Sequence, residues 1–158
     1  MTLQIRRAVS RDADAIAKLS ADFAAEDGGA SMFDAERIRA HGFGANALFE
    51  VWVAEEKRRL LAHAVITKGF DVRRGLPLIV LCELYVVPDY RRSGLARRMM
   101  SSIARRAMDF GARDLTITTG VDNAVAQRFF AAIGADRQQA HVFQMTADGI
   151  QWLATEAL

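Results

Sequence analysis

The most constraining feature of this sequence is residues 87–98, which read Val-Pro-Asp-Tyr-Arg-Arg-Ser-Gly-Leu-Ala-Arg-Arg. The segment has the pattern of a strand end, a short turn and a helix start, and its small residues let the backbone approach a ligand closely. The first turn of a helix has free N–H groups and a partial positive charge. The segment therefore predicts a site for a phosphate or diphosphate at the start of a helix.

Two common phosphate-binding loops are excluded by the residues present. The sequence has no Gly-Lys-Ser/Thr, which excludes a Walker loop, and no G-x-G-x-x-G, which excludes the dinucleotide fingerprint. The pattern is instead Arg91-x-x-Gly94-x-Ala96, with Arg91 and Arg92 just before the turn. Arginine suits the planar, bidentate contacts that phosphate groups offer.

The composition indicates one soluble globular domain over residues 1–158. Of the 158 residues, 51% are apolar and 25% are charged, which is typical of a domain with a proper core. No apolar run approaches the ~20 residues that span a bilayer, and no apolar stretch typical of a signal peptide follows the N-terminus. Cys82 is the only cysteine, and the three histidines share no metal-ligand spacing. We expect a cytoplasmic protein without a metal site or a membrane span.

The central part of the chain predicts a parallel strand–helix–strand unit. Residues 78–87 are a nearly continuous apolar run, as in a strand that is covered on both faces. Residues 94–110 predict a helix, which Gly111 ends, and residues 115–119 predict the next strand. The apolar face of this helix consists of Ala96, Met100, Ile103, Ala107 and Phe110.

The flanking regions predict the elements that complete an α/β domain with a mixed sheet. Alternating patterns indicate strands, and Ser10 has the chemistry of an N-cap for the first helix. The other expected strands are residues 3–8, 49–55, 60–70 and 141–145. The other expected helices are residues 10–25, 34–41, 123–133 and 148–157.

A ligand crevice is expected where the two parallel strands separate at their carboxyl ends. It would lie between residues 78–87 and 115–119, and the helix that starts near Gly94 would point its N-terminus at the same place. One stripe of the 123–133 helix can face this crevice. That stripe consists of Asn123, Ala126 and Phe130.

Three motifs, in order along the chain, resemble the GNAT family of N-acetyltransferases. Arg91-x-x-Gly94-x-Ala96 is similar to the family's Arg/Gln-x-x-Gly-x-Gly/Ala loop, which binds the diphosphate of acetyl-CoA. Glu83-Leu84-Tyr85-Val86-Val87-Pro88 resembles its (Glu/Asp)-Leu-Tyr-Val-x-Pro strand. Asn123-x-x-Ala126-x-x-Phe129-Phe130-x-x-x-Gly134-Ala135 resembles its Asn-x-x-Ala-x-x-(aromatic)-Tyr-x-x-x-Gly-Phe element. The match is close over residues 81–135 and loose over residues 3–70.

The resemblance implies a fold and a mode of acetyl-CoA binding. The fold is a mixed sheet of six to seven strands flanked by helices, with the central strands splayed apart. Acetyl-CoA is the co-substrate, and backbone groups of Leu84, Tyr85 and Val86 pair with its pantetheine arm as an added strand. Asn123 contacts this arm, and Phe130 lines the thiol end. The diphosphate is held by the loop of Arg91, Arg92, Ser93, Gly94, Leu95, Ala96 and Arg97.

The same resemblance implies direct transfer of the acetyl group to an amine, with Glu83 and Tyr85 as candidate catalytic residues. Glu83 either takes the amine proton, or it only ends a ladder or pairs with an arginine. Phe130 stands where the family usually has the tyrosine that protonates the thiolate, and phenylalanine has no proton to give. Tyr85 could protonate the thiolate in its place, unless the role of Tyr85 is packing. A thiol pKa of ~8.5 also allows the thiolate to leave without a proton donor.

The expected acceptor is an amine of a small molecule or a peptide. Acidic residues of the first helices and their loop either suit a cationic acceptor, such as a polyamine, an aminoglycoside or lysine, or form a solvated surface. These residues are Asp22, Glu26, Asp27, Asp34 and Glu36. A homodimer is expected by analogy with the family.

Two other functions stay open. The first is nucleic-acid binding through the arginine-rich helix, although the net charge of +2 and the lack of interleaved aromatic residues argue against it. The second is a CoA-binding module without catalysis, which would explain Phe130. We expect a solvated helix face for Arg97, Arg98, Arg105 and Arg106, burial for Cys82, and surface or pocket positions for His41, His63 and His141.

Overall fold

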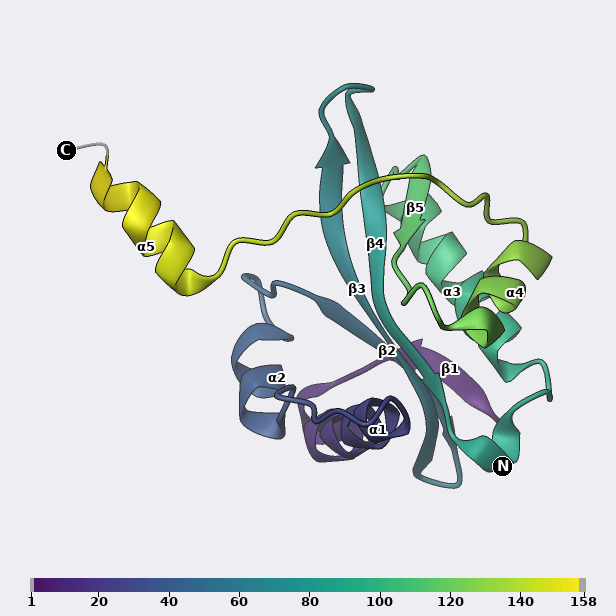
Figure 1. The fold of residues 1–158 in the computed structure, drawn as a ribbon. Coiled ribbons are helices and arrows are strands. Elements are labelled where there is room, and N and C mark those ends of the chain that lie inside the picture. Colours follow the sequence, from purple (N-terminus) through teal and green to yellow (C-terminus); the bar gives the residue numbers. More distant parts are fainter. Residues whose placement is uncertain (1, 157–158) are drawn as a thin grey trace. The chain divides into compact units, whose positions relative to one another are not determined.

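A five-stranded sheet, in which the strands lie side by side in chain order, forms the centre of the first unit (Figure 1). The computed structural model describes residues 2–156, which divide into one unit up to Gly120 and a second from Val121 onward. β1 to β4 pair antiparallel and β4 pairs with β5 in parallel, so the predicted mixed sheet is confirmed. The strands are β1 (Gln4–Arg7), β2 (Glu50–Glu56), β3 (Arg59–Asp71), β4 (Leu76–Val86) and β5 (Asp114–Ile117).

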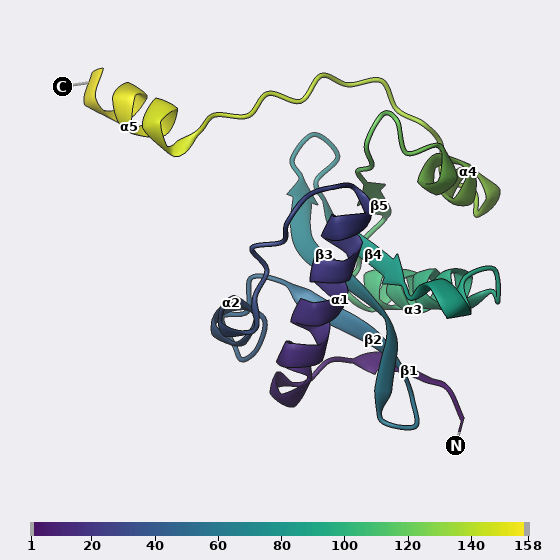
Figure 2. The same cartoon turned by 60° about the horizontal axis from the view of Figure 1, so that its bottom comes forward.

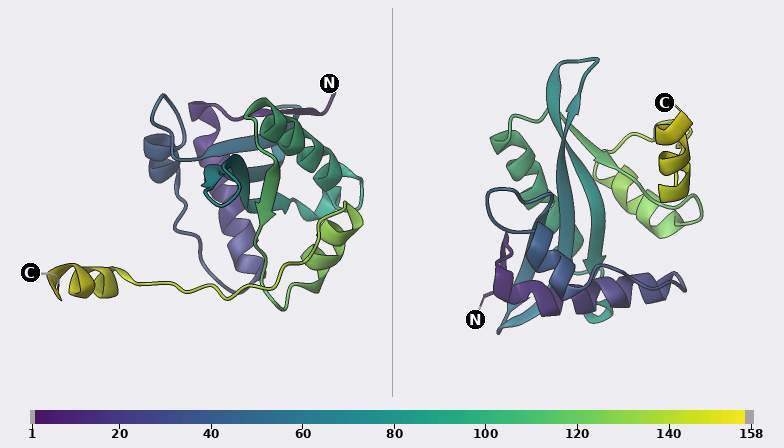
Figure 3. Two further views of the ribbon diagram at one scale, coloured as in Figure 1. Left: turned by 90° about the horizontal axis from the view of Figure 1, so that it is seen from above. Right: turned by 90° about the vertical axis from the view of Figure 1, so that its left-hand side faces the viewer.

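Helices cover both faces of this sheet (Figure 2). On one face lies α1 (Ala13–Glu26), which follows the 3₁₀ turn η1 (Ser10–Asp12), with α2 (Ala35–His41) packed beside it. On the other face lies α3 (Leu95–Asp109), which follows the 3₁₀ turn η2 (Pro88–Tyr90) and contacts all five strands. The hairpin of β3 and β4 projects beyond the other strands (Figure 3, right).

The buried face of α3 starts at Leu95, one residue before the predicted stripe. Leu95 is 2% exposed and Met99 is fully buried, whereas Ala96 and Phe110 are half-buried. Burying a leucine side chain removes much more apolar surface from water than burying an alanine does, so Leu95 and not Ala96 faces the sheet. The predicted residues that are buried are Met100, Ile103 and Ala107.

The sheet has five strands where six to seven were expected, and the difference concerns the last predicted strand. In the second unit, residues 135–146 lie between α4 (Ala124–Ala132) and α5 (Ala147–Glu156) and form no helix or strand. Residues 141–145 pair with none of the described strands. An alternating apolar sequence becomes a strand only where a neighbouring strand takes its backbone hydrogen bonds. The helix predicted over residues 148–157 forms up to Glu156, and Ala157 lies outside the described residues.

The first helix begins differently from the prediction, which placed Ser10 at its N-cap. Ser10 opens η1, and the carboxylate of Asp12 instead accepts the N–H of Val9 at 2.8 Å. Asp12 also accepts hydrogen bonds from two nitrogens of Arg6, at 2.7 and 3.0 Å, and Arg6 donates a further hydrogen bond to Glu55 in β2. Burial alone would raise the pKa of Asp12, but the hydrogen bonds from Arg6 and Val9 hold it below its usual value. A carboxylate with charged donors is a stronger acceptor here than a serine hydroxyl.

Glu50 holds α3 against the sheet through a nearly buried carboxylate. Its side chain is 4% exposed and accepts hydrogen bonds from Nε and Nη2 of Arg106, at 2.8 and 2.6 Å. Nζ of Lys68 lies 3.0 Å from this carboxylate, and Nη2 of Arg7 lies 3.8 Å from it. The hydrogen bonds from Arg106 hold the pKa of Glu50 at about 2, against the effect of burial. The prediction that Arg106 belongs to a solvated helix face was therefore wrong, because its charge is bound to Glu50.

We expect Glu50→Gln to remove a pH-dependent part of the stability. A carboxylate whose pKa is lowered by folding stabilises the fold fully above its unfolded value of 4.5, and this stabilisation is lost as the pH falls toward about 2. At neutral pH the free energy of unfolding should fall by about 2–3 kcal/mol, because the surrounding cations lose their counter-charge.

Urea unfolding across this pH window checks the expectation, since the variant should lose less stability than the wild type as the pH falls. Glu36→Gln is the control, because Glu36 is exposed and lies in the first turn of α2. Equal effects of the two substitutions would argue against the role of Glu50.

Candidate functional site

A bulge at Cys82 decides which side chains of β4 face α1. Val65 of β3 pairs with Glu83, but its neighbour Ile66 pairs with Leu81, so Cys82 is skipped in the register of the two strands. An extra residue shifts the alternation of side chains by one position, so Glu83 and Leu81 point to opposite faces of the sheet. Cys82 is exposed, which contradicts its predicted burial, because the bulge removes it from the packed ladder.

β4 and β5 separate before β4 ends, as the sequence predicted. Their parallel ladder ends at Leu81, and β4 continues to Val86. On the other edge of β4, the N–H of Val87 donates to the carbonyl of Leu61 at 3.0 Å. Because backbone groups alternate along an antiparallel strand, Leu84 and Val86 then turn their N–H and C=O groups away from β3. Among residues 2–156, β4 therefore has an open backbone edge beyond Leu81.

The turn before α3 contains a row of backbone N–H groups that have no acceptor in the described part of the chain. Arg92 has φ 58° and Gly94 has φ 84°, both in the left-handed region, and Gly94 is the N-cap of α3. Within the described part of the chain, the N–H groups of residues 92–97 donate no hydrogen bond. The buried side chain of Leu95 holds the helix start against the sheet. Successive free N–H groups at a helix start suit an anion.

The guanidinium of Arg91 turns away from this loop. Its Nε donates to the carbonyl of Val86 at 2.9 Å, and its Nη2 donates to Oε1 of Glu26 at 2.5 Å. Arg91 thus ties the loop to the end of α1. The side chains of Arg92 and Arg97 are exposed, and neither has a partner among residues 2–156, so these two charges are available to an anion.

Glu83 belongs to a chain of hydrogen-bonded side chains from β3, β4, α1 and the loop after α1. Its Oε1 lies 2.5 Å from Nε2 of His63, and its Oε2 accepts the hydroxyl of Ser20 at 3.2 Å. Oγ of Ser20 lies 3.0 Å from Oγ of Ser31. The side-chain partners of Glu83 are thus a histidine and a serine. The alternative in which Glu83 pairs with an arginine was wrong. His63 is completely buried, so its expected place at the surface or in a pocket was wrong.

Tyr85 is packed against α1, and its hydroxyl donates to Oε1 of Glu26 at 3.2 Å. The centre of the Tyr85 ring lies 5.8 Å from the centre of the Phe23 ring and 5.4 Å from the guanidinium carbon of Arg91. Burial and the negative charge of Glu26 raise the pKa of Tyr85 above its ordinary value, so the phenol stays neutral. These contacts fit the packing alternative, and a catalytic role of Tyr85 stays a prediction.

The other two predicted cofactor contacts, Asn123 and Phe130, lie in the second unit. Oδ1 of Asn123 accepts the N–H of Ala126 at 3.0 Å and caps α4. The half-buried ring of Phe130 has its centre 5.2 Å from that of Phe129. These contacts are all local to α4, and the roles of both residues toward acetyl-CoA stay predictions.

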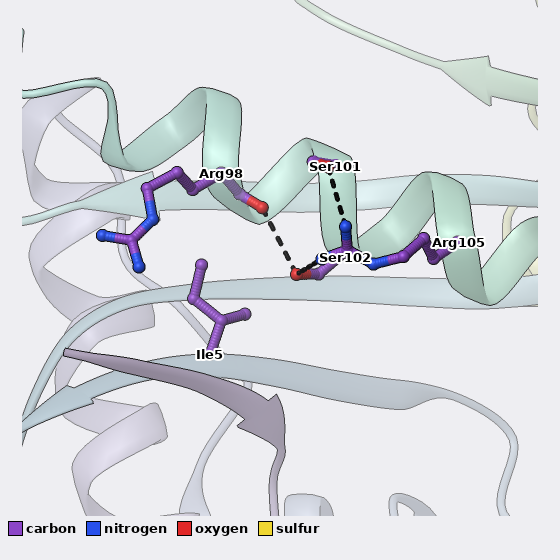
Figure 4. Close-up of a pocket in the computed structure, with 5 residues that line it drawn as sticks. All are labelled: Ile5, Arg98, Ser101, Ser102 and Arg105. Atoms are coloured by element: carbon purple, nitrogen blue, oxygen red, sulfur yellow. Dashed lines mark hydrogen bonds between the residues drawn. The ribbon is translucent and has the colours of Figure 1, made fainter. Parts of the chain in front are cut away.

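A hollow of about 380 Å³ lies beside α3 and β1 (Figure 4). It is lined by Ile5 of β1 and by Arg98, Ser101, Ser102 and Arg105 of α3. Arg105 donates to the hydroxyls of Ser101 and Ser102, both at 3.3 Å, and Ser102 donates to the carbonyl of Arg98. Polar groups of this hollow are thus bonded within the helix, and no predicted site residue lines it.

The described residues offer no cluster for a metal ion. In residues 2–156, no group of three or more His, Cys, Asp or Glu side chains has the arrangement that could hold one. His41 and His141 are exposed. Across the same residues, every helix is too short or too polar to span a membrane.

Known proteins resemble this chain in sequence and in fold. A family model described as the acetyltransferase (GNAT) family matches residues 13–135. Aminoglycoside N(6')-acetyltransferase type 1 of Salmonella typhimurium is 24% identical over 67 residues, which are 42% of this chain and 46% of that enzyme. Thialysine N-epsilon-acetyltransferase of Bos taurus is 26% identical over 131 residues, which are 75% of this chain and 76% of that enzyme.

A solved structure of an aminoglycoside N-acetyltransferase in complex with CoA has a TM-score of 0.71 and 18% identity, covering 90% of this chain and 98% of that one. At this identity the likeness concerns the fold. The chain spans less than half the length of the Salmonella enzyme that it matches. The family model, in contrast, extends from α1 to the residues after α4 and includes β4 and the loop before α3. Because it matches more than half of the chain, the protein belongs to the acetyltransferase (GNAT) family.

Proposed function

We propose that the protein is an acetyl-CoA-dependent N-acetyltransferase, which transfers the acetyl group directly to a primary amine of a small molecule or a peptide. The observation that carries this proposal is the row of free N–H groups at residues 92–97, which follows the open edge of β4. Membership of the GNAT family and the acetyltransferase relatives support it. The thioester supplies an activated acetyl group, so the protein has to hold the thioester and remove a proton from the amine.

The loop before α3 has the donors and the charge that a diphosphate requires. Its N–H groups can each donate a hydrogen bond, and the helix start adds a partial positive charge. The exposed side chains of Arg92 and Arg97 add two full charges. A Cβ added at Gly94 would meet no atom within 4 Å, so this glycine borders open space in which phosphate oxygens can lie. The residues present therefore fit the diphosphate of acetyl-CoA.

The pantetheine arm would follow the open edge of β4. Within residues 2–156, the N–H and C=O of Leu84 and the N–H of Val86 have no partner at this edge, while the carbonyl of Val86 accepts a hydrogen bond from Arg91. The backbone of Tyr85 faces β3, so Leu84 and Val86 are the residues able to pair with the arm as an added strand. An N–H of this edge directed at the thioester carbonyl would stabilise the negative charge that develops on its oxygen.

Glu83 is the proposed base. In the transfer, the amine nitrogen bonds to the carbonyl carbon, the carbon–sulfur bond breaks, and its electron pair leaves with the sulfur. The proton lost by the nitrogen goes to the carboxylate of Glu83, whose side chain is 19% exposed and can be reached. An ordinary thiol pKa of ~8.5 lets the thiolate depart unaided and take a proton from water, since the hydroxyl of Tyr85 is directed at Glu26.

Gly94→Glu should abolish the binding of CoA. The new carboxylate would occupy the space of the diphosphate and repel it, because the side chain would enter the open space beside the free N–H groups. Calorimetric titration with CoA should show an affinity at least about a hundredfold lower, or about 2.8 kcal/mol.

Gly44→Glu is the matched control for this experiment. Gly44 has φ 85°, close to that of Gly94, and a Cβ there also meets no atom within 4 Å, but it lies in the loop before β2. Its variant introduces the same charge and the same backbone strain and should bind CoA normally. Unchanged affinity of Gly94→Glu would show that the diphosphate binds elsewhere.

The acceptor is proposed to be a small cationic amine. The two relatives named above are an aminoglycoside acetyltransferase and a thialysine acetyltransferase, and both of these substrate classes carry positive charges. Of the five acids that the sequence offered as counter-charges, Asp22, Glu26 and Asp34 are bonded within the protein. Asp27 and Glu36 are exposed and have no side-chain partner in the described part of the chain, so they are free to attract a cation.

A thiol-release assay with a panel of amines tests the activity. We expect turnover of acetyl-CoA with at least one of kanamycin, thialysine and a lysine-containing peptide, and slower turnover with a neutral amine, because the free acids favour cations. Mass spectrometry should find one added acetyl group on the amine. Binding of CoA without turnover on any amine would favour the alternative suggested by Phe130, a CoA-binding module without catalysis. DNA binding that weakens with salt and is unaffected by CoA would favour the alternative of nucleic-acid binding.

A homodimer that buries apolar residues of the second unit is also proposed. Val142 is 87% exposed, Phe143 is 94% exposed and Trp152 is 62% exposed, and Met145 and Ile150 are each more than half exposed. Apolar side chains gathered within a short segment at such exposure are typical of a protein interface. Analogy with the family points in the same direction.

Phe143→Ser combined with Trp152→Ser should convert a dimer into a monomer, because the two largest of these exposed side chains are removed. In sedimentation equilibrium the wild type should have twice the chain mass of 17.4 kDa, and the double variant the mass of one chain. Val72→Ser is the control, since Val72 is 85% exposed but follows β3 in the first unit. A monomeric wild type would refute the dimer.

A further inference from the structure

We propose that His63 is a positioning residue that fixes the carboxylate of Glu83, so that Oε2 alone accepts the amine proton and releases it through Ser20 and Ser31. This inference rests on the proposed role of Glu83 as the base. His63, Ser20 and Ser31 lie outside the motifs from which the sequence analysis drew its candidate residues. The fold brings them together from β3, α1 and the loop after α1.

The bulge at Cys82 places Glu83 on the same face of the sheet as His63. In the ladder of β3 and β4, His63 pairs with Tyr85 and Val65 pairs with Glu83, so His63 and Glu83 are diagonal neighbours. Nε2 of His63 and Oε1 of Glu83 are 2.5 Å apart. The imidazole is completely buried, and its centre lies 6.1 Å from that of the Tyr85 ring. Packing thus holds the imidazole in one orientation, with Nε2 toward the carboxylate.

The second ring nitrogen decides where the hydrogen of His63 lies. Nδ1 is buried and has no hydrogen-bond partner among the described residues. A hydrogen on Nδ1 alone would leave the lone pair of Nε2 facing Oε1 of Glu83, which would place two acceptors 2.5 Å apart. A second hydrogen on Nδ1 would be a buried donor without an acceptor in the described part of the chain, which costs about 1–3 kcal/mol. His63 therefore carries its hydrogen on Nε2 and donates it to Oε1 of Glu83, which leaves Oε2 for the amine proton.

The other oxygen of Glu83 leads toward solvent. Ser20 donates to Oε2 at 3.2 Å and is 1% exposed. Because the only hydroxyl hydrogen of Ser20 is donated to Oε2, the hydroxyl of Ser31, 3.0 Å away, donates to Ser20 and accepts the N–H of Phe33. Ser31 is half-buried, so water can reach it. After Oε2 gains a proton, both hydroxyls rotate, so that Ser20 takes that proton, the former hydrogen of Ser20 passes to Ser31, and the former hydrogen of Ser31 passes to water. One proton leaves for each amine acetylated, and the carboxylate is restored.

Two substitutions of His63 separate hydrogen bonding from packing. His63→Leu removes the donor but keeps a buried side chain, and kcat should fall about tenfold because the carboxylate loses its fixed orientation. His63→Gln places an amide N–H within reach of Oε1, and kcat should recover to within about threefold of the wild type. The KM for acetyl-CoA should change less than about twofold in both variants, because the diphosphate loop is left intact. The assay uses acetyl-CoA with kanamycin or thialysine as the acceptor.

Ser20→Ala tests the path for the proton. It should lower kcat about tenfold, since the path from Oε2 is interrupted. Ser102→Ala is the matched control, because Ser102 is a buried serine on α3, on the opposite face of the sheet, and it should leave kcat unchanged. A His63→Leu variant with the kcat of the wild type would overturn the proposal. A His63→Gln variant as slow as His63→Leu, with an equal unfolding midpoint, would also overturn it, because packing alone would then explain the loss.

Glu83→Gln distinguishes a failure of this inference from a failure of the proposed base. A Glu83→Gln variant with full kcat would remove Glu83 from the mechanism, and the role of His63 with it. If Glu83→Gln lowers kcat about a hundredfold while His63→Leu does not lower it, Glu83 is the base and His63 does not position it. Nitrogen-15 NMR of the wild type tests the tautomer without any turnover. We expect hydrogen on Nε2 and a bare Nδ1, and the reverse arrangement would refute the inference.

Discussion

β4 and β5 separate after Leu81, and this separation exposes the backbone edge on which the candidate site is built. From Leu78 to Leu81 the strand is bonded on both edges, and beyond Leu81 one edge has no strand partner among the described residues. Backbone N–H and C=O groups need partners, so such an edge persists only where water or a ligand can reach it. The chain then turns through η2 into the loop before α3, so the open edge leads directly into the free N–H groups of residues 92–97.

Several charges elsewhere in the first unit are paired within the fold, whereas two arginines of the loop before α3 have no carboxylate partner in the described part of the chain. Three carboxylates each tie a helix or a loop to its neighbours through arginine. These pairs are Asp12 with Arg6, Glu50 with Arg106, and Glu26 with Arg91. A chain with a net charge of only +2 can therefore still offer a local positive site, because Arg92 and Arg97 have no carboxylate partner in the described part of the chain.

The bulge at Cys82 connects the architecture of the sheet to its chemistry. Without the extra residue, Glu83 would share a face with Leu81, on the side that α3 covers. With it, the carboxylate turns toward α1, where His63 binds one oxygen and Ser20 the other. A carboxylate held in this way is oriented by groups from two other segments of the chain, which is the condition for a base that acts at a defined position.

The sequence predicts the features that depend on neighbours in the chain, namely the strand–turn–helix of β4 and α3, the family motifs and the approximate bounds of β1 to β4. It could not determine the bulge, because a bulge exists only in the register of two strands. It also predicted a strand at residues 141–145, where the described structure supplies no partner. The contacts of His63 with Glu83 and of Arg106 with Glu50 could be seen in the fold alone, because they join residues 20 and 56 positions apart through the packing of the whole sheet.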